Sequence, residues 1–435
     1  MTKRMLLAIL LLIVFALPAG CQKQGGEPTQ PTAPAPTILP THTPEPSPTP
    51  TPDPVGEALA GMTVEQKAAQ LLVAGIEGTE PVEDAVQAVQ GYQVGGVILF
   101  GRNVESAEQL AALTNGLKEL NGDYTPLFLC VDQEGGRVDR MPPEVTDLPS
   151  ALDFASIADP EARMDACFTL GQTLAAQCAA FGFNMDFAPS LDIWSNPENT
   201  VIGDRAFGTD AATVTGAANE TALGILSGGV IPVAKHFPGH GDTAVDSHYG
   251  LPVVDKSLEE LEELELRPFR QAIDTTCVYG TYGGDTSIPA IMVAHILLSQ
   301  IDPDNPASLS PEVVTGLLRE EMGYEGVVCT DDLTMGAISN TYGMGEAAVL
   351  AVEAGCDLLL VCHGADNLAA AHAALVEAVE SGRISMERLD ESVYRVLSLK
   401  AVYGLSNAPV EAPDIEALND RIAALERSIE ADTSQ

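Results

Sequence analysis

Residues 94–102 read VGGVILFGR, a short apolar run that ends in a glycine and a charged residue. The chain contains seven further short apolar runs with polar residues at or just after their ends, and longer amphipathic stretches separate the runs. Apolar runs joined by amphipathic helices are typical of buried parallel strands with crossover helices. The eight runs are 68–76, 94–102, 126–134, 183–193, 231–237, 290–296, 326–332 and 356–364.

Eight such units predict an α/β protein with a single (β/α)8 TIM-like barrel. The expected intervening helices include 106–120, 161–181, 258–273 and 368–380. A doubly wound dinucleotide-binding sheet is disfavoured, because no G-x-G-x-x-G follows the first apolar run. The barrel is expected to occupy residues 55–405, with a C-terminal helical extension over 406–435.

The N-terminal region is predicted to lie outside the barrel. Residues 1–21 combine a basic start, an apolar run and small residues before Cys21, which is typical of a lipoprotein-type signal peptide with Cys21 as the lipidated residue. Residues 22–54 contain eleven prolines and seven threonines, a composition that favours an extended, disordered linker. We expect a protein on the outer face of a bacterial cytoplasmic membrane, held by its N-terminal lipid, or a secreted one.

Charge and cysteine usage limit the partners. The chain has 21 Lys+Arg against 62 Asp+Glu and a formal net charge of −41, which disfavours nucleic acid because such binding depends on basic residues that neutralise phosphates. No cysteine pair has C-x-x-C spacing. Cys130, Cys329 and Cys362 lie in apolar runs, where a free cysteine packs as a small hydrophobic residue.

Polar residues gather directly after the apolar runs, which is where a barrel places its active site. Five of the seven histidines lie at these ends or in the loop that follows the fifth run. This pattern predicts a catalytic rim rather than a set of solvated strand ends. The rim residues are Arg102, Asp132, Arg137, Arg140, Asp186, Asp192, Lys235, His236, His295, Asp331, Asp332 and His363.

A metal-dependent barrel hydrolase is an alternative, since imidazoles and carboxylates at strand ends could bind zinc. Against it, the first run ends LLVAGIEG without an H-x-H, and the histidines of 235–248 lack helical ligand spacing. We therefore expect no metal and no cofactor. A lipid-anchored sugar-binding protein without turnover is a third reading.

Four motifs carry a family resemblance. They are KHFPGHGDTAVDSH at 235–248, VVCTDDLTM at 327–335, VDQEGGRVDR at 131–140 and GDRAFG at 203–208. Together they resemble the β-N-acetylglucosaminidases of glycoside hydrolase family 3, which trim GlcNAc from peptidoglycan fragments. The resemblance covers residues 58–400, and it implies a retaining exo-hydrolase that acts on β-linked GlcNAc.

The resemblance also assigns roles. Asp331 is implied as the nucleophile and His248, paired with Asp246, as the general acid/base, whereas most retaining glycosidases use two carboxyl groups. Asp332 is expected to support the site or cap a helix, and His240 to be structural. Arg102 and Arg137 are expected in rim ion pairs, and His295 either lines the pocket or packs in the core. The implied sugar-binding residues are Asp132, Arg140, Arg205, Lys235, His236 and His295.

Three expectations concern the variable parts. Glycines and a proline in 237–244 predict a flexible loop over 239–247 that brings His248 to bound sugar. The Gly- and Tyr-rich insert 274–289 is expected to shape the entrance, and the helix over 414–431 to pack on the barrel rather than dimerise. β-Glucosidase or phosphorolytic activity at the same site stays open, because a histidine acid/base does not repel phosphate.

Overall fold

The computed structural model describes residues 53–244, 246–275 and 288–433. The expected signal peptide with Cys21, the linker up to residue 52, and residues 276–287 of the insert lie outside these ranges. None of the helices in the described ranges has the length and hydropathy needed to cross a bilayer. Within the same ranges, every cysteine is buried and free, including Cys130, Cys329 and Cys362 as predicted.

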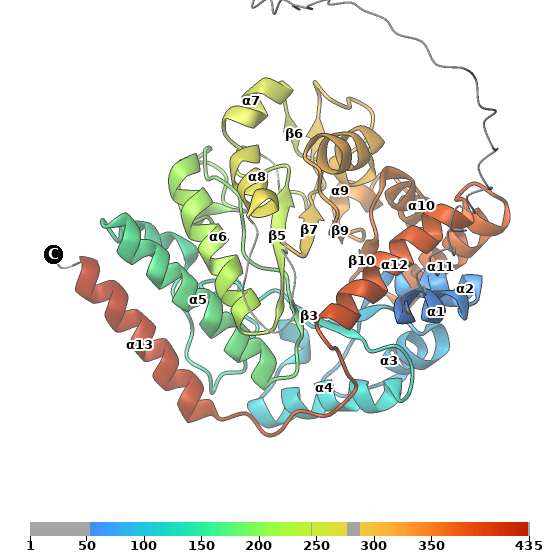
Figure 1. Cartoon of the computed structure of the whole chain (residues 1–435), viewed down its shortest axis with the longest axis horizontal. Coiled ribbons are helices and arrows are strands. Elements are labelled where there is room, and N and C mark those ends of the chain that lie inside the picture. The colour runs from blue at the N-terminus through green and yellow to red at the C-terminus, as the bar shows by residue number, and fades with distance from the viewer. Residues whose placement is uncertain (1–52, 245, 276–287, 434–435) are drawn as a thin grey trace, which may run out of the picture. The chain divides into compact units, whose positions relative to one another are not determined.

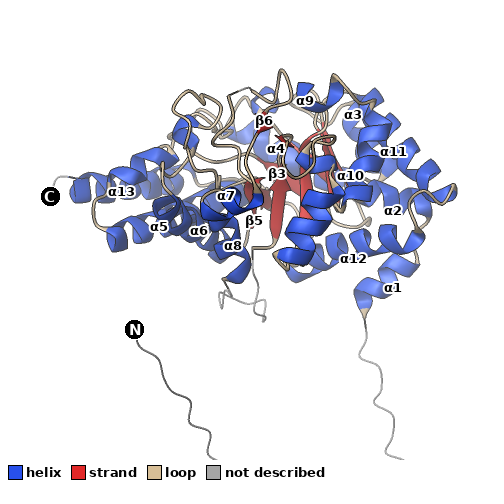
Figure 2. Ribbon diagram, turned by 90° about the horizontal axis from the view of Figure 1, so that it is seen from above, coloured by secondary structure: helices blue, strands red, loops and turns tan. Residues whose placement is uncertain are grey.

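Eight parallel strands close into a barrel in the order β1-β10-β9-β7-β5-β4-β3-β2, which confirms the predicted fold class. Helices surround the strands (Figures 1 and 2). The barrel strands are β1 (Leu72–Gly75), β2 (Gly96–Ile98), β3 (Phe128–Val131), β4 (Met185–Asp186), β5 (Ile231–Phe237), β7 (Ala290–Val293), β9 (Val327–Asp332) and β10 (Leu358–Val361). A separate parallel pair joins β6 (Val253–Val254) to β8 (Leu297–Leu298).

The α-helices lie between and after these strands. They are α1 (Pro54–Ala60), α2 (Val64–Gln70), α3 (Glu83–Val86), α4 (Ala107–Asn121), α5 (Pro160–Ala180), α6 (Ala211–Ser227), α7 (Leu258–Glu263), α8 (Leu266–Asp274), α9 (Gly336–Ser339), α10 (Met344–Ala354), α11 (Ala365–Glu380), α12 (Met386–Val402) and α13 (Ile415–Thr433). Two π-helices, η1 (Gln87–Tyr92) and η6 (Glu312–Glu321), and the 3-10 turns η2 (Gly101–Asn103), η3 (Ala151–Ser156), η4 (Gly203–Arg205) and η5 (Ala307–Leu309) complete the set.

Local sequence explains where several helices begin. Ser106 caps α4 through a bond from the backbone N–H of Gln109 to its hydroxyl oxygen, and Asp159 caps α5. The expected helix over 258–273 is instead two helices, α7 and α8. The chain leaves helical geometry at Leu264, and Glu265, which follows, is buried with its carboxylate 2.5 Å from Lys256.

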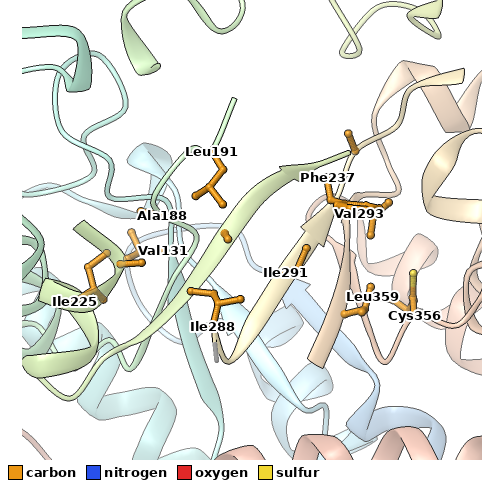
Figure 3. Packing of buried hydrophobic residues seen from close by; sticks show 14 of the residues in the cluster. Val131, Ala188, Leu191, Ile225, Phe237, Ile288, Ile291, Val293, Cys356 and Leu359 are labelled. Atoms are coloured by element: carbon orange, nitrogen blue, oxygen red, sulfur yellow. The ribbon is translucent and has the colours of Figure 1, made fainter. Parts of the chain in front are cut away.

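Alternation along the strands divides the core into two layers. Val73 belongs to a cluster inside the barrel, whereas its neighbours Leu72 and Ala74 belong to the larger cluster between strands and helices. Figure 3 shows members of that outer layer, among them Phe237 and Leu359. The interior is therefore filled with side chains, so a ligand of the barrel would lie at the ends of the strands and not inside the barrel.

Two features close the barrel. At its seam, a Cβ on Gly75 would lie 2.0 Å from the carbonyl oxygen of Cys362, so only glycine allows the end of β1 to approach β10. At its floor, Val396 and Leu399 of α12 join the interior cluster. The Lys400 ammonium, also buried, donates to the side-chain oxygen of Gln70 and the carbonyl of Gly95 and lies 4.8 Å from the Phe128 ring centroid.

Candidate active site

A cavity lies at the carboxyl ends of the strands, where a (β/α)8 barrel was predicted to carry its site. It holds about 920 Å³ when its open mouth is included. Seven of the nine residues predicted for catalysis or sugar binding line it, and they come from β5, β9 and the segments that follow β3, β4 and β5. These residues are Asp132, Arg140, Arg205, Lys235, His236, His248 and Asp331.

Asp331 is the second-to-last residue of β9, and one carboxylate oxygen accepts the backbone N–H of Asp332 at 2.7 Å. Burial by itself would raise the pKa of Asp331, but the nearby His295, His236 and Lys235 outweigh burial and lower it below its ordinary value. The carboxylate is therefore ionised at neutral pH, as a nucleophile requires.

His248 lines the same cavity from the loop that follows β5. Its Nδ1 is 2.8 Å from a carboxylate oxygen of Asp246, and that oxygen also accepts the His248 backbone N–H at 2.9 Å. Burial opposes ionisation of Asp246, yet the two bonds from His248 lower the pKa of this carboxyl overall. Asp246 thus holds one ring nitrogen, which leaves Nε2 for a proton transfer. The predicted mobility of 239–247 stays a prediction.

A buried charge cluster forms the floor of the cavity. Lys235 Nζ lies 2.5 Å from Asp132 and 2.7 Å from Glu134, and Arg205 donates two bonds to Glu134 at 2.9 and 2.7 Å. Burial raises the pKa of Glu134, but Arg205 and Lys235 more than offset it, so the net shift is strongly downward. The cluster joins two basic side chains to two carboxyl groups, and Asp132, at 20% side-chain exposure, lines the cavity.

His236 lies beside this cluster. Its Nδ1 is 2.6 Å from Asp192, and its Nε2 is 3.4 Å from Arg205. Asp192 also accepts the backbone N–H of His240 at 2.6 Å. Burial, followed by the neighbouring His236, lowers the pKa of His240 to about 4, so this imidazole is neutral at physiological pH. Asp192 therefore fixes both His236 and the start of the loop that leads to His248.

Several predicted residues lie elsewhere. His295 does not line the cavity: it is fully buried behind Asp332, with Nε2 2.9 Å from the Asp332 carbonyl oxygen and Nδ1 2.7 Å from the Ser308 hydroxyl. Its electrostatic contact with Asp331 lowers the pKa of that carboxyl, and its place behind the cavity lining corrects the prediction that it binds sugar. Asp332 lines the cavity but accepts bonds from Thr334 and Cys362, as expected of a supporting carboxylate.

The remaining rim residues have structural partners. Arg102 pairs with Glu77 at 3.3 Å and Arg137 with Asp204 at 2.8 Å, in agreement with the expected rim ion pairs. Asp186 is buried, accepts the backbone N–H of Gln133, and does not line the cavity. Strand alternation explains this, because Met185 before it and Phe187 after it both face the barrel interior.

Sequence reasoning missed Glu134, which bridges Lys235 and Arg205. A signal was present, since Glu134 stands two residues after Asp132 and an extended chain puts both on one side. Asp192 was recognised as a rim residue but not as the partner of His236. Phe100 and Met335 also line the cavity, and no feature of the sequence singled them out.

The described residues contain no group of three or more His, Cys, Asp or Glu side chains arranged to hold a metal ion. Three of the four imidazoles that line the cavity hydrogen-bond to protein side chains, which are Asp246 for His248, Asp192 for His236 and Thr243 for His240. The arrangement suits proton transfer and hydrogen bonding to hydroxyl groups.

Comparisons with known proteins agree with this geometry. Residues 63–399 match the family model described as the glycosyl hydrolase family 3 N terminal domain. The chain is 34% identical over 353 residues to a β-hexosaminidase of Nitrosomonas eutropha, and this alignment covers 80% of this chain and 97% of the relative. A β-hexosaminidase of Methylococcus capsulatus is 40% identical over 287 residues, covering 66% of this chain and 80% of the relative.

Among solved structures, the chain resembles a glycoside hydrolase family 3 β-N-acetylglucosaminidase from Paenibacillus sp. str. FPU-7. The two are 41% identical with a TM-score of 0.77, and the alignment covers 85% of this chain and 69% of that one.

Proposed function

This chain belongs to glycosyl hydrolase family 3 and is a β-hexosaminidase of that family, and we propose that it releases terminal β-linked GlcNAc with retention of configuration. The residues proposed for the chemistry are Asp331, His248 and Asp246. One observation carries the proposal: the ionised Asp331 and the Asp246-held imidazole of His248 line the same cavity.

In the first proposed step, Asp331 attacks the anomeric carbon as the bond to the leaving oxygen breaks. His248 gives that oxygen its Nε2 proton, so the leaving sugar departs as a neutral alcohol. In the second step, neutral His248 takes a proton from water, the hydroxide displaces Asp331, and the β-configured sugar is released.

A histidine suits this double role. An ordinary imidazole titrates at about pH 6.5, so it can both give and take a proton near neutrality without the large upward shift that a carboxyl acid needs. Asp246 would stabilise the imidazolium that is present before the first step and forms again in the second, as the carboxylate does in a Ser-His-Asp triad.

We propose that the charge cluster on the cavity floor recognises the sugar. Charged donors and acceptors form stronger hydrogen bonds to hydroxyl and acetamido groups than neutral ones do. Asp132, Lys235 and Arg205 are held by one another and by Glu134, so little side-chain freedom remains to be lost on binding. Arg140 and His236 complete the proposed binding set.

We propose peptidoglycan fragments as the natural substrate and a lipid anchor at the membrane as the location of the protein. The support is the sequence of residues 1–21, with Cys21 after small residues, and the Pro- and Thr-rich composition of 22–54. Palmitate labelling of the wild type but not of Cys21→Ala is expected in a bacterial host. Equal labelling of both proteins would remove the anchor from the proposal.

The decisive test uses 4-nitrophenyl β-GlcNAc with purified variants. Asp331→Ala is expected to lose about 10³-fold or more in kcat and to form no glycosyl-enzyme detectable by mass spectrometry. His248→Ala is expected to lose about 10²- to 10⁴-fold in kcat, and azide, which needs no base, restores turnover as the β-glycosyl azide. Asp366→Ala and His372→Ala, which lie outside the cavity, serve as matched controls and should stay at wild-type activity.

Two results would contradict the proposal. A glycosyl-enzyme that still forms in Asp331→Ala would assign the nucleophile to another group. Loss of activity in EDTA, restored by zinc, would favour the metal-dependent reading. Phosphorolysis is not favoured, and the same assay with phosphate tests it, since a phosphorylase would release GlcNAc-1-phosphate in place of GlcNAc.

A further inference from the structure

The loop that carries His248 rests on the segment that follows the nucleophile strand. The backbone N–H of Gly336 donates to the carbonyl of His248 at 3.2 Å, and the N–H of Ala337 donates to the carbonyl of Ser247 at 3.0 Å. The Asn340 side chain donates to the Tyr249 carbonyl at 3.2 Å. The carbonyls of three consecutive loop residues are therefore held, two by the first two residues of α9 and one by Asn340, which follows the last residue of α9.

These main-chain contacts decide where the imidazole lies. The His248 side chain is 64% exposed, and among the described residues the one side chain within hydrogen-bond reach of it is Asp246, which belongs to the same loop. Packing of the ring itself therefore cannot fix its position. The backbone of Ser247, His248 and Tyr249 must do so, and α9 begins four residues after Asp332, the last residue of β9.

A second contact holds the loop from within. The buried His240 ring bonds through Nδ1 to the Thr243 hydroxyl at 2.8 Å and through Nε2 to the Ser247 hydroxyl at 3.2 Å. Ser247 is thus held on both sides, by its hydroxyl to the base of the loop and by its carbonyl to Ala337.

Gly336 permits this approach. A Cβ at position 336 would lie 2.6 Å from the carbonyl oxygen of His248 and 3.2 Å from the carbonyl carbon of Tyr249, which are backbone atoms that cannot rotate away. Its φ lies outside the left-handed region, so alanine could adopt the same backbone conformation. The side-chain space, not the backbone angle, therefore demands glycine at this position.

We propose that Gly336 is a positioning residue for catalysis: by letting the acid/base loop dock on the start of α9, it fixes His248 relative to Asp331. The inference rests on the proposed role of His248. On this view the segment from the end of β9 to the start of α9 positions both reacting groups. It carries Asp331 itself, and it holds the loop that carries His248.

The test separates steps that need His248 from a step that does not. Gly336→Ala and wild type are compared on N,N′-diacetylchitobiose, whose leaving sugar needs a proton, and on 2,4-dinitrophenyl β-GlcNAc, whose leaving group does not. We expect kcat/KM for chitobiose to fall about 10- to 100-fold, the cost of misplacing a catalytic group by roughly 1 Å. For the dinitrophenyl glycoside, kcat/KM should stay within about threefold, while kcat and KM fall together because deglycosylation still needs the base.

Gly343→Ala is the matched control, because a Cβ at position 343 meets nothing within 4 Å and its φ of −68° suits alanine. Asn340→Ala is the second variant, used also if Gly336→Ala fails to fold, and a smaller loss with the same substrate split is expected. Equal losses on both substrates, or no loss in either variant, would overturn the docking role. A His248→Ala enzyme that lacks the substrate split would instead overturn the proposed acid/base, whatever Gly336→Ala does.

Discussion

At the scale of single residues, the site depends on charges that are buried in compensating pairs. Lys235 is 1% exposed and contacts two carboxylates. Burial would lower its pKa, but Asp132 and Glu134 raise it overall, so the ammonium stays charged through the physiological range. Removing one partner from such a pair leaves an uncompensated charge inside the protein.

Lys235→Met is therefore expected to lower the free energy of unfolding by about 3 kcal/mol and to raise KM for the chromogenic substrate. Arg137→Met is the matched control. The Arg137 side chain is 43% exposed, so its ion pair with Asp204 should contribute at most about 1 kcal/mol to the free energy of unfolding. Urea unfolding of both variants measures the difference. Equal costs would show that Lys235 is not a buried structural charge.

At this scale the sequence was enough to locate most of the site residues, but it did not show which of them contact one another. Residue type and position after an apolar run placed Asp331, Lys235 and His236 at the rim, and the family resemblance was needed to choose Asp331 over its neighbour Asp332. Whether a polar residue after a strand faces the cavity or the helices depends on strand alternation, which the sequence of a two-residue strand such as β4 does not reveal. Asp186 and His295 were placed at the rim for that reason, although both are buried away from the cavity.

At the scale of elements, strand count and strand order followed from the repeated apolar run. Exact bounds did not, because tertiary contacts set them. Residues 68–70 of the first apolar run belong to helix α2, and the expected helix over 258–273 is broken where Glu265 reaches Lys256. The contact between Gly336 and His248 joins segments that are distant in sequence, so no local pattern could indicate it.

Helix α13 packs on α5, as the spacing of its apolar residues predicted (Figure 1). Leu418, Ile422 and Leu425 are buried in this contact. Ile422→Ala is expected to lower the free energy of unfolding by about 2 to 4 kcal/mol without changing kcat/KM, because α13 does not line the cavity. Glu426→Ala, an exposed neighbour, should change the stability by less than about 0.5 kcal/mol. Loss of activity in Ile422→Ala at a temperature where it is folded would contradict this separation.

At the scale of the whole molecule, one buried lysine links stability to pH. Burial lowers the pKa of Lys400 at the barrel floor to about 7. Between that value and the ordinary lysine pKa, the unfolded chain binds a proton that the folded chain does not, so the free energy of unfolding contributed by Lys400 rises with pH. Below about pH 7 both states are protonated, and this gain is absent.

Lys400→Met lacks this titration. We therefore expect the Tm of the wild type, measured relative to that of Lys400→Met, to increase between pH 6 and pH 9. Differential scanning calorimetry at both pH values tests the sign. A difference that stays constant or decreases would mean that the lysine keeps its ordinary proton affinity at the barrel floor.

The seam between β1 and β10 has a consequence for biosynthesis. Leu72 to Ala74 pair with Leu359 to Val361, so the first strand has only β2 as a neighbour until nearly the whole chain has left the ribosome. A ring of strands whose first and last members pair cannot close until the last of these strands has been synthesised. The pairing at this seam therefore delays closure of the barrel until β10 is available, late in the synthesis of the chain.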